Sequence, residues 1–164
     1  MLEVKTYDPA QINLFVGGFR LSGYAPGTFI QLALDVPRFS DDQGVDGEPI
    51  RWDNKNPFSR LTVSLSQTSV SNTVLSGLAV ADRYTQAAIF PIYLEEGDVF
   101  SSPGSILSGG LKSNYISAQA WITGQAAIGY GPDPIARVWE FRLIHVYFVN
   151  PGVSSTPVLE NTIT

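Results

Sequence analysis

The sequence of 164 residues contains no cysteine and a single histidine, His145. The lack of cysteine excludes disulfide bridges, thiolate zinc sites and cysteine nucleophiles. One histidine leaves a structural zinc site without enough of its usual ligands, and no G-x-S-x-G pattern accompanies it to suggest a serine hydrolase. We therefore predict that the protein is not an enzyme, and we assign no catalytic, cofactor-binding or metal-binding residue.

Charged residues are also scarce, at 15% of the chain against about 25% in an average protein. Fifteen acidic and ten basic residues give a net charge of −5, so a groove that holds DNA phosphates tightly is not expected. No apolar stretch approaches the roughly 18 residues of a membrane span, and the first residues lack the pattern of a secretory signal. We expect no membrane partner, folding in the compartment of synthesis, and a weakly charged surface that suits burial against other subunits.

Alternation of apolar and small polar residues is the main pattern in the sequence. It runs through residues 29–36 and 60–68, where one side of each predicted strand is expected to face the core and the other to be small and polar. The predicted core positions are Ile30, Leu32, Leu34, Val36, Leu61, Val63 and Leu65, and the polar positions between them include Gln31, Asp35, Thr62, Ser64 and Ser66.

Other segments complete a mainly β prediction. Gly17 and Gly18 predict a tight hairpin, and residues 88–94 and 99–102 predict a second one. Residues 116–122 and 137–149 read as strands, with His145 inside the second. Helical spacing over 71–84, with Ser71 as N-cap, predicts one α-helix. The predicted fold is an antiparallel β-sandwich or barrel with one packed helix and extended loops.

Residues 37–49 interrupt this pattern with proline, glycine and four acids, which indicates a loop or extended arm. The acids miss the spacing of a calcium-binding loop, so a solvated or partner-facing segment is favoured. The Ser- and Gly-rich residues 103–114 indicate a surface loop. We predict one domain over 1–150 that carries the arm, and a C-terminal tail over 151–164 that is flexible or docked on a neighbour.

Several stretches resemble one protein family. They are YDPAQINLFVGGFRLSGYAPGTFI from residue 7, DQGVDGEPIRW from residue 42, LTVSLSQTSVSNTVLSGL from residue 61 and IFPIYL from residue 89. Their order and spacing resemble tail tube proteins of contractile-tailed bacteriophages, which are similar to the type VI secretion tube protein. The resemblance covers about residues 7–102, with weaker similarity at 120–122 and 138–149. Residues 104–117 and the tail beyond 151 look longer than the family pattern.

The resemblance implies a structural virion protein whose hexameric rings stack into a tube that conducts the phage genome during ejection. It implies contacts with further copies, with the tail sheath, tape measure, baseplate hub and tail terminator proteins, and with DNA that passes without specific binding. It implies assembly in the host cytoplasm and a final place in the virion tail. The alternatives are a β-sandwich binding module, such as a fibre or carbohydrate-binding domain, or another tail or baseplate subunit.

Two sets of site residues follow from this model. The small polar face is expected to line the bore, or else to be merely solvent-exposed. The arm is expected to reach a neighbouring subunit or ring, or else to be a mobile surface loop. The candidate lumen-facing residues are Gln31, Asp35, Thr62, Ser64 and Ser66, and the candidate interface residues are Arg38, Phe39, Asp41, Asp42, Asp46 and Glu48.

Overall fold

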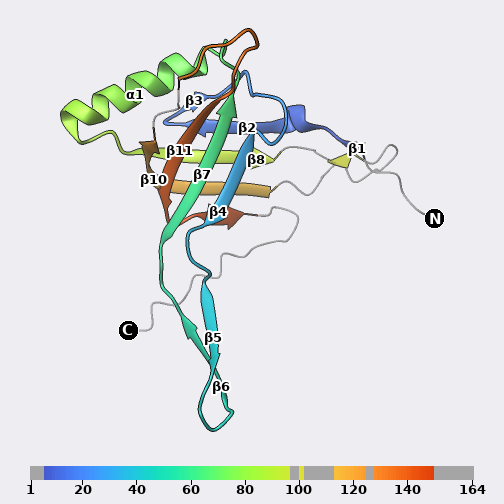
Figure 1. The fold of residues 1–164 in the computed structure, drawn as a ribbon, viewed down its shortest axis with the longest axis vertical. Helices are drawn as coiled ribbons and strands as arrows, with labels where there is room; N and C mark the ends of the chain where they lie inside the picture. Colours follow the sequence, from blue (N-terminus) through green and yellow to red (C-terminus); the bar gives the residue numbers. More distant parts are fainter. Residues whose placement is uncertain (1–5, 97–99, 102–112, 125–127, 150–164) are drawn as a thin grey trace. The chain divides into compact units, whose positions relative to one another are not determined.

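The computed structural model describes residues 6–96, 100–101, 113–124 and 128–149 (Figure 1). The predicted tail over 151–164 and nearly all of the predicted loop over 103–114 lie outside these residues. The chain forms two compact units. The first comprises Met1–Leu21, Pro91–Ser117 and Tyr147–Thr164, and the second comprises Ser22–Phe90 and Ala118–Val146.

The first unit is built on an antiparallel sheet with the strand order β3-β2-β8-β10, and β12 also pairs with β10. Gly17 and Gly18 form the two-residue turn between β2 and β3 at φ values of 57° and 84°, which confirms the first predicted hairpin. Its elements are β1 (Thr6–Tyr7), the 3-10 helix η1 (Pro9–Gln11), β2 (Ile12–Val16), β3 (Phe19–Arg20), β8 (Phe90–Glu96), β9 (Phe100–Ser101), the start of β10 (Ser113–Gly124) and β12 (Tyr147–Val149).

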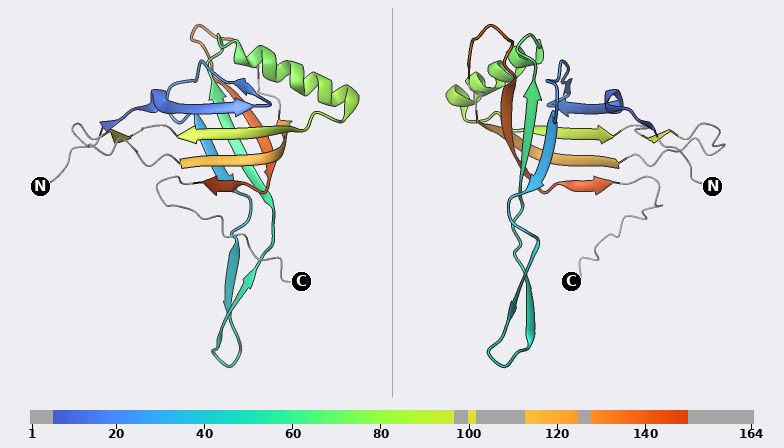
Figure 2. Two further views of the ribbon diagram at one scale, coloured as in Figure 1. Left: turned by 180° about the vertical axis from the view of Figure 1, so that it is seen from behind. Right: turned by 45° about the vertical axis from the view of Figure 1, so that its right-hand side comes forward.

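The second unit holds a sheet with the order β10-β11-β7-β4, a separate hairpin of β5 and β6, and the helix α1 (Figures 1 and 2). The strand pairs β10–β11, β11–β7, β4–β7 and β5–β6 are all antiparallel. The described residues therefore confirm the predicted mainly β, antiparallel fold with one α-helix. The elements are β4 (Ile30–Leu34), β5 (Phe39–Gln43), β6 (Pro49–Asp53), β7 (Phe58–Leu65), α1 (Ser71–Thr85), the rest of β10 and β11 (Arg137–Ile144).

The core of the second unit follows the predicted alternation along β7, and β11 alternates in the same way. Apolar side chains of alternate residues are buried on one side of these strands, and Leu75 of α1 is also buried. Asn72 accepts a hydrogen bond from the Trp139 indole at 3.0 Å, so a buried polar pair links the helix to the sheet. The buried positions on the two strands are Leu61, Val63, Leu65, Trp139, Phe141 and Leu143.

The helix confirms the predicted segment but not the predicted cap. The N-cap is Val70 rather than Ser71, and its side chain makes no capping hydrogen bond; the Ser71 amide donates instead to the Ser69 Oγ at 3.2 Å. The Ser71 hydroxyl instead bonds to the backbone of Ser22, accepting from its amide at 2.9 Å and donating to its carbonyl at 3.2 Å. The helix ends at Thr85, and its C-cap Gln86 adopts the left-handed conformation at φ 53°.

Two strand predictions were wrong in their connections. The predicted strand over 137–149 is divided, because His145 has a φ of 48° and separates β11 from β12, which pairs with β10. The His145 amide donates to the carbonyl of Pro57 at 2.9 Å, which holds this turn. The second predicted hairpin is absent among the described residues, since β9 pairs with β1.

Candidate assembly surface

The face of the second unit's sheet opposite the core is arranged in cross-strand rows. Gln31 of β4, Thr62 of β7 and Glu140 of β11 form one row, since Thr62 is in register with both of the others. The neighbouring row consists of Ala33, Arg60 and Arg142. Arg60 and Glu140 are exposed and Thr62 and Arg142 are half-buried, so this face is open to solvent in the single chain.

The structure brings four of the five candidate lumen residues to this region and separates the fifth. Gln31, Thr62 and Ser64 lie on the open face, and Asp35 follows directly after β4. Ser66 lies beyond the end of β7, where its amide donates to the Gly23 carbonyl at 2.7 Å. Whether this face lines a bore remains a prediction.

The sequence analysis listed Asp35 among the lumen candidates but missed the two arginines that it contacts on this face. Asp35 contacts the guanidinium of Arg142 and also that of Arg60, the latter at 3.6 Å. Arg142 additionally lies over the Phe58 ring, 5.8 Å from its centroid. Arg60 and Arg142 occupy the same alternate positions as the small polar residues, so the period of two could have identified them.

Strand β4 is an edge of this sheet and is more exposed than its sequence pattern predicted. Leu34 is 63% exposed and Val36 is 38% exposed, so these two residues do not belong to the core of the single chain. The carbonyl of Phe29 and the amide of Asp35 both bond to β7. Because hydrogen-bonded positions alternate along an antiparallel pair, the amides of Ile30, Leu32 and Leu34 point to the edge of β4 that no other described strand pairs with. This edge can accept another strand.

The predicted arm is a β-hairpin formed by β5 and β6, and it continues to Asp53 rather than ending at residue 49. In Figure 1 it extends beyond the ends of β4 and β7, on the side away from α1. A two-stranded hairpin alone is at best marginally stable in water, so burial by a partner would stabilise it. Of the candidate interface residues, Arg38 precedes β5, Phe39, Asp41 and Asp42 lie in it, and Asp46 and Glu48 lie in the turn.

The two faces of the arm differ in chemistry. One face carries Phe39, whose ring lies 3.6 Å from the guanidinium carbon of Arg51. The other carries Ile50 and Trp52, which are 51% and 45% exposed. These two apolar residues, and the exposed Val45 at the tip, were not among the predicted interface residues. The predicted interface set followed the acids, whereas the exposed apolar area lies on β6.

The base of the arm is held by Asn54. Its side-chain amide donates to the Pro37 carbonyl at 2.6 Å and to the Ser40 hydroxyl at 2.7 Å, and its backbone amide donates to the Arg38 carbonyl at 2.9 Å. These bonds join the chain leaving β6 to the chain entering β5. Asn54 thus ties the two legs of the arm together where they leave the sheet.

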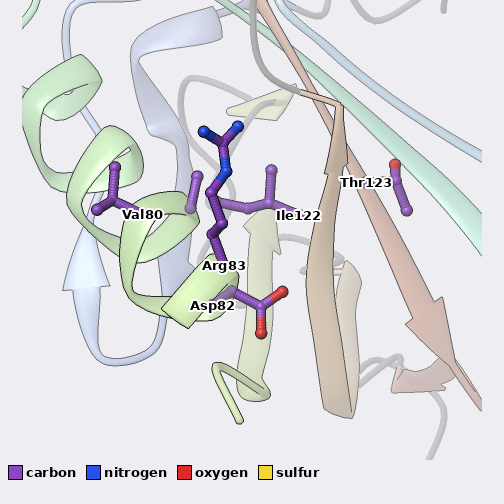
Figure 3. A pocket seen from close by; sticks show the side chains of 6 residues that line it. Val80, Asp82, Arg83, Ile122 and Thr123 are labelled. Atoms are coloured by element: carbon purple, nitrogen blue, oxygen red, sulfur yellow. The ribbon is translucent and has the colours of Figure 1, made fainter. Parts of the chain in front are cut away.

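A pocket of about 390 Å³ lies between α1 and β10 (Figure 3). Figure 3 shows the Arg83 side chain between the helix and Ile122. Asp82, also in the lining, caps the following turn by accepting a hydrogen bond from the Ala88 amide at 3.1 Å. Among the described residues of the lining, no nucleophile is paired with a base. The residues are Ala79, Val80, Asp82, Arg83, Ile122 and Thr123.

The first unit has a second hollow of about 400 Å³ with a mainly apolar lining. Among the described residues there is no group of three or more side chains suited to binding a metal. No helix in the same ranges is both long and apolar enough to cross a membrane. The lining of the second hollow is Phe15, Gly18, Pro91, Ile92, Tyr93, Glu95 and Ile116.

The sequence is similar to that of a phage protein. The chain is 27% identical over 171 aligned residues to structural protein ORF10 of Pseudomonas phage KPP10, covering 99% of this chain and 92% of that protein. The chain is a homologue of a phage structural protein. It is a structural protein and not an enzyme, as the sequence analysis predicts. No family model matches it.

Solved structures with the same fold come from contractile injection systems. The tube-terminating cap of the anti-feeding prophage matches with a TM-score of 0.57 and 9% identity, covering 92% of this chain and 95% of that one. The sheath/tube terminator of the PVC extracellular contractile injection system matches at 0.57 and 12%, covering 87% and 95%. A chain of the PVC sheath-tube complex matches at 0.58 and 11%, covering 88% and 91%. At these identities the likeness shows the fold alone.

Proposed function

We propose that this phage structural protein is a tail tube subunit whose hexameric rings stack into a channel for the genome. The observation that carries the proposal is the open β4 edge beside a sheet face that is uncovered in the single chain. An unpaired edge of this kind is a site for pairing with another copy. The phage homologue and the tube-associated structures with the same fold support the proposal.

The sheet of the second unit has a size that suits such a ring. Six copies that each contribute β10, β11, β7 and β4 supply 24 strands. At about 4.8 Å between strands and a tilt of about 40°, 24 strands close into a barrel roughly 48 Å across. Side chains filling about 5 Å of each wall leave a bore of roughly 38 Å, which passes a DNA duplex about 20 Å wide.

The proposed partners follow from this role. Copies of the chain pair within and between rings, with the arm contacting a neighbour, and DNA passes through the bore without specific binding. Sheath, tape measure, baseplate hub and tail terminator proteins are the other proposed contacts, and the assembled tube belongs to the virion after assembly in the host cytoplasm.

A terminator or cap is the second candidate function. Two of the similar structures are a tube-terminating cap and a sheath/tube terminator. In this role the chain would form the same proposed ring but end the stack. Negative-stain electron microscopy of the purified protein separates the two, because a tube subunit gives stacked tubes at high concentration and a terminator gives single rings.

Substitution of Leu34 by proline tests the strand-edge pairing. Proline removes an amide that faces the open edge and leaves the β4–β7 hydrogen bonds in place. Since the Leu34 side chain is mostly exposed, we expect a folded Leu34→Pro subunit that forms no rings by microscopy or sizing chromatography. The matched control, Leu34→Ala, keeps the amide and is expected to assemble. Normal rings from Leu34→Pro, or a wild-type protein that stays monomeric at every concentration, would overturn the proposed function.

A further inference from the structure

The open face of the second unit contains a compact set of charges drawn from three strands. Asp35 follows β4, Arg60 lies on β7 and Arg142 lies on β11, and Arg60 and Arg142 are directly in register. One carboxylate therefore stands against two guanidinium groups. The side chains of Asp35 and Arg142 are only 22% and 27% exposed, whereas that of Arg60 is 54% exposed.

Two guanidinium groups side by side on a sheet face have the chemistry of a phosphate site. Guanidinium forks bind phosphate oxygens in pairs, and adjacent arginines can contact successive phosphates of a nucleic acid backbone. In this protein Asp35 occupies that position. With Glu140 on the same face, the four charged side chains sum to zero, and the small polar residues beside them add no charge.

We infer that Asp35 is a built-in counter-ion that masks a latent nucleic-acid phosphate site formed by Arg60 and Arg142. The inference rests on the proposed function, in which DNA moves past this face. Arg142 and Arg60 hold the end of the edge strand β4 in place through their contacts with Asp35, so the two arginines stabilise the sheet. The same contact with Asp35 keeps the two guanidinium groups from binding the phosphates of DNA that moves past this face.

Masking each site matters because the site is repeated in every subunit of the proposed ring. Each phosphate that a protein neutralises releases condensed counter-ions. For duplex DNA, each such phosphate makes the slope of log affinity against log salt concentration steeper by about 0.9. Loss of Asp35 changes the face of each subunit from neutral to +1, and a ring of six from neutral to +6. Stacked rings would repeat this charge along the channel. A modest affinity for phosphate at each site would then add up to strong retention of the DNA inside the channel.

The test measures binding of a fluorescently labelled 20-base-pair duplex to the purified full-length protein by anisotropy, from about 50 to 200 mM salt. We expect Asp35→Asn to bind at least tenfold more tightly than wild type at the lowest salt, with a steeper salt dependence. Asp41→Asn is the matched control, because it removes the same charge from the exposed arm. The triple variant Asp35→Asn/Arg60→Gln/Arg142→Gln is expected to return to wild-type binding.

The outcomes separate this inference from the proposed function. Asp35→Asn protein that binds DNA no more tightly than Asp41→Asn overturns the inference, even if it forms normal rings. A wild-type protein that never forms rings overturns the proposed function, while the DNA comparison is still read on the single subunits. Asp35→Ser removes the same carboxylate with a smaller side chain, and thermal melting of both variants verifies that folded protein is being compared.

Discussion

At the scale of single residues, Tyr115 of β10 offers a prediction about pH. Burial raises the pKa of its phenol above the usual 10.0, and the Glu96 carboxylate raises it further. The folded protein therefore holds this proton more tightly than the unfolded chain, so the free energy of unfolding falls as the pH rises above about 10. We expect Tyr115→Phe to lose less stability than wild type in urea unfolding between about pH 9 and pH 11.

The exposed Tyr84 provides the control for that experiment, since its side chain is 83% exposed on α1. Tyr84→Phe is expected to follow the wild-type curve. Tyr115→Phe also keeps the ring that packs 5.1 Å from Phe148, so its stability at neutral pH is a check on packing. Equal losses of stability for wild type and Tyr115→Phe at high pH would contradict the prediction.

Polar residues in the core were the hardest to predict from the sequence. Asn72 bonds at both ends of its side-chain amide, donating to the Ser66 carbonyl at 2.8 Å and accepting from Trp139. In the sequence it appears as a polar residue in the first turn of a helix, and its partner lies 67 positions away. The capping role assigned to Ser71 failed for the same reason, because its hydroxyl bonds to Ser22, which is distant in sequence. Periodicity carries no information on such contacts.

At the scale of elements, the arm provides a matched comparison of exposed apolar residues. Ile50 on β6 is 51% exposed and Val80 on α1 is 50% exposed. Substitutions at exposed positions usually change the free energy of unfolding by less than about 0.5 kcal/mol. We expect Ile50→Ser to leave the melting temperature nearly unchanged and to weaken ring or tube formation at least tenfold, measured as the concentration needed for assembly in sedimentation velocity.

Val80→Ser removes an equally exposed apolar side chain from another element, and we expect it to assemble like wild type. If both variants assemble normally, the arm does not bury Ile50 against a neighbour. If both fail, the loss reflects a general dependence on exposed apolar area rather than the arm.

Elements that bury one face within the single chain were predicted well from their period. The buried alternation of β7 and the helical spacing of α1 were both found as expected, as was the Gly17–Gly18 turn. The arm and the exposed part of β4 were not, because the period of two does not say whether the chain itself or a partner covers the apolar side. Leu34 was assigned to the core on the same evidence that correctly assigned Leu61.

At the scale of the whole molecule, net charge sets a condition for assembly. Each copy carries −5 at neutral pH, so six copies bring together six times −5, or −30. Like charges oppose association, and salt screens them, with a Debye length that falls from about 20 Å at 20 mM to about 6 Å at 300 mM. We expect sedimentation velocity to show more rings at the higher ionic strength.

The opposite trend, with rings dissociating as salt rises, would show that attractive ion pairs hold the subunits together rather than strand pairing and apolar contacts. Running the series in both chloride and fluoride salts separates screening from specific effects of one anion.

The hydrogen bonds of Asn54 at the base of the arm have a mechanical consequence. Because Asn54 joins the two chain segments at the base of the arm, the hairpin moves relative to the sheet as one rigid element rather than as two independent segments. Strands of five residues give an arm about 17 Å long, so a rotation of about 5° at the base moves the tip by roughly 1.5 Å. A small change in the hydrogen bonds of Asn54 therefore produces a larger displacement at the tip of the arm. The range of angles at which the arm can meet a neighbouring subunit is set at Asn54 and not at the contact itself.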